Sequence, residues 1–113
     1  MLFLFGEQIK MVDQSTDVDK LEGFFAEVIA TMNWQFTSHE FLLRLAHDHQ
    51  KEYVGALGSY MTNGTPFKEL HHELIKRLHK LDGQIVTLQR KDYPSRDIFG
   101  VVSTAAIWRK KMA

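Results

Sequence analysis

The hydrophobic pattern changes from a period of 3.6 residues to a period of two at Asp82-Gly83, and this change strongly limits the possible folds. Before it, apolar residues recur as they do on one face of a helix. After it, Ile85-Val86-Thr87-Leu88 is rich in β-branched residues, which favour strands. Helices followed by strands predict an α+β domain. A chain of 113 residues without cysteine has the size of one domain and excludes disulfides and thiolate metal sites.

Two helices are expected in the first half of the chain. The first spans roughly 17–33, where its apolar residues fall on one helical stripe: Leu21, Phe24, Phe25, Val28, Ile29 and Met32. The second begins after Thr37, because Thr37-Ser38-His39-Glu40 has the pattern of a capping box. Four polar residues at 47–50 interrupt its apolar face. They leave two alternatives, one long bent helix or two helices with a turn at 47–50.

A further helix is predicted over 66–81, with Thr65 as its cap and Pro66 in the first turn. Its expected buried stripe consists of Phe67, Leu70, Leu74, Leu78 and Leu81. The strand at 85–88 follows, then a polar loop tip at 91–97 that contains Pro94, and a returning strand from Ile98 to about Trp108. Gly100 is a candidate bulge in that strand. The two strands are expected to form an antiparallel hairpin.

This order of elements resembles the winged helix-turn-helix family. The resemblance lies in the helix at 20–33, the Thr37–Glu40 start of the next, the 66–81 helix, the strand at 85–88 and the tip at 91–97. It covers about 20–108 and implies a winged-helix-like α+β fold, with three to four helices followed by a C-terminal β-hairpin wing. The domain would span 17–113. Residues 49–61 add a helical stretch, so either 49–61 or 66–81 can hold the recognition position.

The resemblance implies duplex DNA binding of the kind found in transcriptional regulators, with the recognition helix in the major groove. The charged residues are distributed unevenly along the chain. Residues 1–33 carry a net charge of −4, residues 34–65 carry −1 and residues 66–113 carry +5. A basic region of this kind suits phosphate binding. The candidate nucleic-acid-binding residues are Lys68, His72, Lys76, Arg77, Lys80, Arg90, Lys91, Tyr93 and Arg96.

The alternative is a winged-helix module that binds proteins and no nucleic acid. The acidic first helix, the apolar N-terminus and the zero net charge of the whole chain favour it. An enzyme is not expected, because the chain has no glycine-rich phosphate loop, nucleophile elbow or cysteine. No metal or other cofactor is expected either, since His47 and His49 diverge on a helix and His72 and His79 lie two turns apart.

Met1-Leu2-Phe3-Leu4-Phe5 is too short and too soon followed by charges to be a secretory signal or a membrane span. The sequence therefore predicts a cytoplasmic protein without a membrane partner. Residues 1–16 are expected to be an ordered extension of the domain. Because so apolar a segment is unfavourable in water, Leu2, Phe3, Leu4 and Phe5 are predicted to form the interface of a homodimer.

Overall fold

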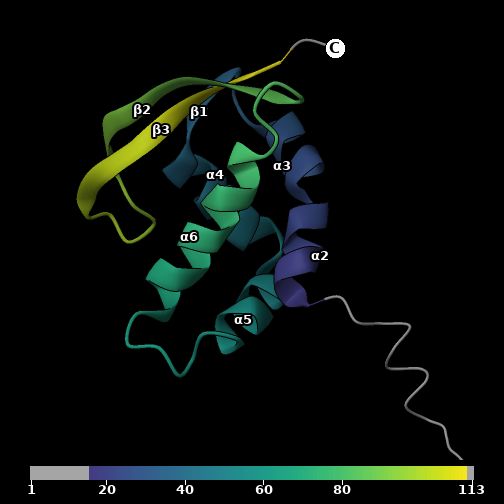
Figure 1. Cartoon of the computed structure of the whole chain (residues 1–113), viewed down its shortest axis with the longest axis vertical. Helices are drawn as coiled ribbons and strands as arrows, with labels where there is room; N and C mark the ends of the chain where they lie inside the picture. Colours follow the sequence, from purple (N-terminus) through teal and green to yellow (C-terminus); the bar gives the residue numbers. More distant parts are fainter. Residues whose placement is uncertain (1–15, 112–113) are drawn as a thin grey trace, which may run out of the picture.

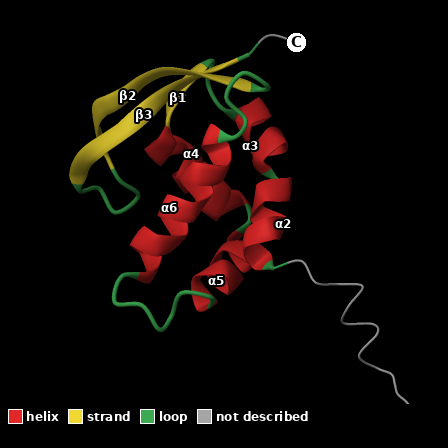
Figure 2. Ribbon diagram, in the orientation of Figure 1, coloured by secondary structure: helices red, strands yellow, loops and turns green. Residues whose placement is uncertain are grey.

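The computed structural model describes residues 16–111, so the predicted interface residues Leu2–Phe5 lie outside the described part of the chain. Five helices and three strands follow one another within that part (Figures 1 and 2). They are α2 (Asp17–Gly23), α3 (Phe25–Thr31), β1 (Gln35–Thr37), α4 (Ser38–Asp48), α5 (Gln50–Gly58), α6 (Pro66–His79), β2 (Val86–Arg96) and β3 (Val102–Lys110). The predicted α+β class is confirmed. The sheet lies at one end of the helices, above α4 and α6 in Figure 1.

The sheet is antiparallel, with strand order β1-β3-β2. The predicted hairpin is therefore present, but its tip lies at 97–101 and not at 91–97. Residues 91–96 continue β2, whose pairing with β3 is irregular between Leu88 and Tyr93. Because β2 is an edge strand, it tolerates polar side chains and Pro94, whose missing N–H interrupts no inner ladder. Gly100 belongs to the tip, where its φ of +83° suits glycine, and is not a bulge in the strand.

The helix predicted over 17–33 is broken at Phe24 into α2 and α3. A second break, at His49, separates α4 from α5 and decides for two helices with a turn at 47–50. The two breaks lie against each other, because the rings of Phe24 and His49 stack with their centroids 3.7 Å apart. His49 Nε2 also lies 3.2 Å from a carboxylate oxygen of Glu27. The stacked rings and the contact with Glu27 therefore connect the two breaks.

The capping box at the start of α4 is confirmed. The Thr37 hydroxyl accepts from the Glu40 amide at 3.1 Å, and the Thr37 amide donates to Glu40 Oε1 at 2.7 Å. Phe36 and Phe41 are both buried, with ring centroids 6.4 Å apart. Thr65 makes no side-chain cap at α6, so Pro66 is the local signal that holds at that helix start.

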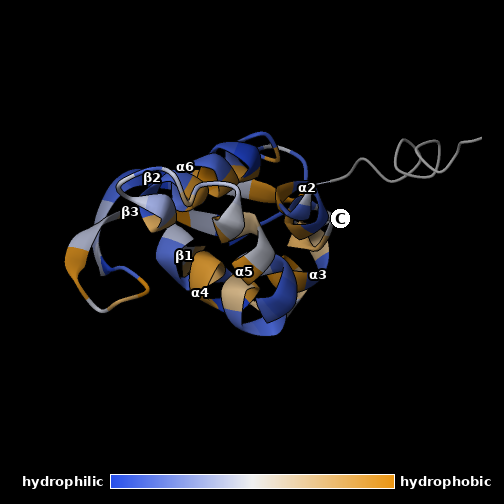
Figure 3. Cartoon of the chain, turned by 90° about the horizontal axis from the view of Figure 1, so that it is seen from below, coloured by the Kyte–Doolittle hydropathy of each residue, from blue (hydrophilic) through white to orange (hydrophobic). Residues whose placement is uncertain are grey.

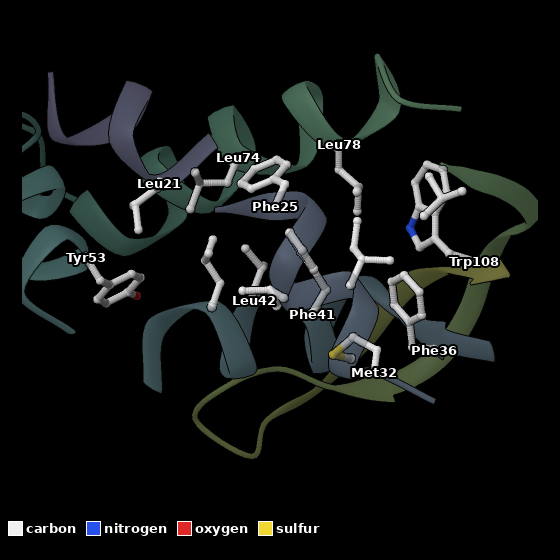
Figure 4. Packing of buried hydrophobic residues seen from close by; sticks show 14 of the residues in the cluster. Leu21, Phe25, Met32, Phe36, Phe41, Leu42, Tyr53, Leu74, Leu78 and Trp108 are labelled. Carbon is white, nitrogen blue, oxygen red and sulfur yellow. The ribbon is translucent and has the colours of Figure 1, made fainter. Parts of the chain in front are cut away.

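The core lies between the helices and the inner face of the sheet (Figure 4). Trp108 of β3 is completely buried, and its indole N–H donates to the equally enclosed Ser38 hydroxyl at 2.9 Å. Leu70, Leu74 and Leu78 form the buried stripe of α6 as predicted. Two residues predicted to belong to that stripe do not. Phe67 is 39% exposed and packs edge-to-face against Phe99 of the hairpin tip, and Leu81 is partly buried beyond the end of α6 at His79.

Candidate nucleic-acid interface

A groove of about 880 Å³ runs between α6, the first turn of α4 and the β2–β3 hairpin. One wall is helical and carries Lys68, His71, His72 and His79 of α6 together with His39 of α4. The opposite wall belongs to the hairpin and includes Lys91, Asp97 and Thr104. The groove exists because the hairpin curls back toward the start of α6, where Phe67 and Phe99 meet with their ring centroids 4.9 Å apart.

Three of the predicted nucleic-acid-binding residues line this groove. Lys68 and His72 on α6 and Lys91 on β2 line it from opposite sides, and all three side chains are exposed. The groove thus joins the two segments that the sequence predicts to act together. Lys76 on α6 and Lys80, directly after its end, are exposed outside the lining. Lys76 also lies 3.7 Å from a carboxylate oxygen of Glu73, so its charge is partly compensated.

Arg77 is occupied by carboxylates on the side of α6 that faces α2. Its Nη1 donates to Asp19 and to Glu22, both at 2.9 Å, and its Nε donates to Glu73 at 2.8 Å. Partial burial lowers the pKa of Arg77, but the bonds to Glu73 and Asp19 outweigh it and raise the pKa above its usual range. The same bonds lower the pKa values of Asp19 and Glu73. Arg77 therefore links α6 to α2. The carboxylates of Asp19, Glu22 and Glu73 compensate its positive charge, so it would attract a phosphate only weakly.

The remaining predicted residues lie along the hairpin and have partners within it. Arg90 Nε donates to the Asp92 carbonyl at 3.1 Å, and its guanidinium lies 5.6 Å from the centre of the Tyr93 ring. Tyr93 is 39% exposed. Arg96 Nη1 donates to the Gly100 carbonyl at 2.8 Å, so it stabilises the tip. These three side chains are accessible, but the groove lining does not include them.

The groove lining also includes three polar residues that interact with one another and that the sequence did not single out as a cluster: His39, His71 and Asp97. His71 Nε2 shares a hydrogen bond of 2.6 Å with the hydroxyl of Tyr53. Burial lowers the pKa of His71, and burial also raises the pKa of Tyr53 to about 12. Both groups are therefore neutral near pH 7. The position of His71, four residues before Ile75 and next to the buried stripe, is the signal that marks it as inward-facing.

Asp97 accepts hydrogen bonds from the amides of Phe99 and Val101, at 2.9 and 3.0 Å. The bond from Val101, with that from Phe99 and the nearby imidazoles of His39 and His71, lowers the pKa of Asp97 despite an opposing effect of desolvation. The carboxylate therefore stays ionised. It lies close enough to His39 and His71 to influence the groove electrostatically, although it comes from the opposite wall.

No group of three His, Cys, Asp or Glu residues in the described part of the chain is arranged to hold a metal ion. His47 and His49, which have metal-like spacing in the sequence, bind different carboxylates: His47 contacts Asp48, and His49, the non-helical residue between α4 and α5, contacts Glu27. Among residues 16–111, no helix combines the length and apolar character needed to cross a bilayer.

Comparison of the sequence with models of known protein families gives no match, and comparisons with curated proteins and with solved structures give none either.

Proposed function

We propose that this chain is a winged-helix protein that binds duplex DNA, with α6 as the recognition helix and the β2–β3 hairpin as the wing. The observation that carries the proposal is the position of Lys68 and His72 on one wall of the groove and of Lys91 on the opposite wall. A duplex lying along this groove would place its phosphates near cations of both walls. Such contacts release counterions and supply sequence-independent affinity.

Three observations favour α6 over α5 as the recognition helix. The exposed side of α6 carries Lys68, His72 and Lys76 together with Glu69, and Lys80 follows directly after the helix, whereas α5 has one lysine, Lys51, next to Glu52. In addition, α5 packs closely against α2, whose first turn is acidic and would repel phosphate. α6 is also the helix that borders the hairpin across the groove.

The test is a titration of a fluorescent mixed-sequence duplex, followed by anisotropy, at salt concentrations from about 50 to 200 mM. The double variant Lys68→Gln/Lys91→Gln should bind more weakly and should flatten the slope of log K against log salt by about two units. The matched control is Lys20→Gln/Lys51→Gln, which removes two exposed lysines from α2 and α5. The control should leave the slope unchanged. A flat titration of the wild-type protein at about 50 mM salt would discard DNA binding.

One observation favours the second candidate, a protein-interaction module. The hairpin tip exposes a cluster of large apolar side chains, with Phe99 60%, Val101 59% and Val102 66% exposed, and Figure 3 shows it as an orange segment apart from the helical core. Exposed apolar clusters often mark protein contacts. If a second copy of the chain binds there, Phe99→Ser/Val102→Ser should shift the sedimentation of the full chain toward a monomer. This candidate also requires the wild-type protein to have no affinity for duplex at low salt.

A further inference from the structure

We propose that the groove between α6 and the hairpin binds a small organic acid with an aromatic body and a single acid group. Binding of this ligand does not require DNA and does not rest on the proposed function. The volume of about 880 Å³ lies within the range of about 300–1,000 Å³ that is usual for small-molecule sites.

The apolar surface of the groove suits an aromatic body. Leu42 and Ile75 come from the helical wall, and Ile98 and Ala105 come from the hairpin. At the start of α6, the ring of Phe67 meets the ring of Phe99 edge-on, at an interplanar angle of 89°. These side chains would contact a ligand from both walls of the groove. They would remove apolar surface of the ligand from water, which is the main source of affinity for such ligands.

One buried polar atom belongs to a residue that lines the groove and lacks a partner. Among the buried side-chain nitrogen and oxygen atoms of residues 16–111, His39 Nδ1 has no hydrogen bond. Its neighbours are already satisfied, because His71 bonds to Tyr53 and Asp97 accepts two backbone amides. A buried polar atom without a partner is costly, and a ligand or water that pairs with it recovers that cost. Because this atom is enclosed, the imidazole of His39 must turn toward the groove before a ligand there can pair with it.

The charges of the groove select an anion. Lys68 and Lys91 stand on opposite walls, and the ion pairs found among residues 16–111 use other cations. An acid group near these lysines gains two favourable interactions. Asp97 also lines the groove, and its carboxylate is ionised. A second acid group on the ligand would be repelled there, so a monoanion fits best.

The experiment uses two fluorescent probes with the same aromatic body, 8-anilinonaphthalene-1-sulfonate and the uncharged N-phenyl-1-naphthylamine. Both are titrated into the full chain without DNA. The wild-type protein should bind the sulfonate saturably at one site. Lys68→Gln/Lys91→Gln should weaken the sulfonate about 5- to 10-fold and change the neutral probe less than about twofold, since each lysine contributes a modest, partly screened interaction. Lys20→Gln/Lys51→Gln is the charge-matched control.

A second variant tests the location without altering charge. Thr104 is exposed and lines the hairpin wall, so Thr104→Trp should fill the groove and abolish binding of both probes while circular dichroism shows a folded protein. The proposal is overturned if the wild-type protein binds no sulfonate saturably, if the lysine variant weakens both probes equally, or if folded Thr104→Trp binds as the wild type does. Because DNA is absent from these titrations, their failure leaves the duplex titration as a separate result.

Discussion

The buried hydrogen bond between Trp108 and Ser38 connects both walls of the groove, because Ser38 begins α4 and Trp108 lies in β3. Ser38 is 4% exposed and Trp108 is fully enclosed, so water cannot replace either partner. In Ser38→Ala the indole N–H stays buried without an acceptor. A buried donor that loses its partner costs about 1–3 kcal/mol. For a domain of this size we expect the Tm to fall by about 4–8 °C per kcal/mol.

The measurement is urea unfolding followed by circular dichroism, with Ser59→Ala as the control because Ser59 is exposed in the loop after α5. The control should lose less than about 0.5 kcal/mol. A double-mutant cycle with Trp108→Phe should show a coupling of at least about 0.5 kcal/mol, because the double variant removes both partners of the bond together. If Ser38→Ala is as stable as the control, or if the cycle is additive, the hydrogen bond does not connect the two walls as we argue.

Further predictions concern a helix contact, a buried imidazole and assembly. Gly58 has open space around it, so Gly58→Ala should stabilise the protein by up to about 1 kcal/mol in urea unfolding. Gly55→Ala should stabilise it less, because the added Cβ would overlap the Asp17 carboxyl group. Removing that carboxyl group with Asp17→Ala should restore the stabilisation by Gly55→Ala. Burial lowers the pKa of His71 in the folded protein below its ordinary value of 6.5. The folded protein therefore favours the neutral imidazole, and the free energy of unfolding that this supplies is present above pH 6.5 and is lost as the pH falls through the folded-state pKa. Urea unfolding at pH 7.5 and 5.5 should reveal this loss, and His71→Gln should remove it. Deleting residues 1–10 should convert a homodimer into a monomer in sedimentation, and a full-length protein that is already monomeric at high concentration contradicts that prediction.

Local chemistry explains what the sequence could predict of the fold. The capping box at Thr37 and the leucines of α6 depend on neighbours three or four residues away, so they can be recognised from the sequence. β1 was not predicted, because its three residues form a strand only when β3 lies beside them. The break at Phe24 was missed for the same reason, since it is stabilised by the distant ring of His49.

The candidate site was predictable only in part. Charge and helical position correctly placed Lys68, His72 and Lys91 on accessible surfaces, because exposure of charged side chains follows from local pattern. The sequence could not show that Arg77 meets Asp19 and Glu22, since that ion-pair cluster requires α2 and α6 to pack together. The cluster of His39, His71 and Asp97 likewise depends on where the hairpin turns back. The polar residues 91–96 have the composition of a loop although they belong to β2, so the sequence placed the turn too early.

The pairing of β1 with β3 also has a consequence for the folding pathway. Gln35 pairs with Arg109 and Phe36 pairs with Trp108, so the sheet joins segments that are far apart along the chain. Bringing such segments together requires loop-closure entropy before any contact rewards it. We expect the helices and the local β2–β3 hairpin to form first and β1 to join late. Substitutions in β1 should then have φ-values near zero and should speed unfolding more than they slow folding.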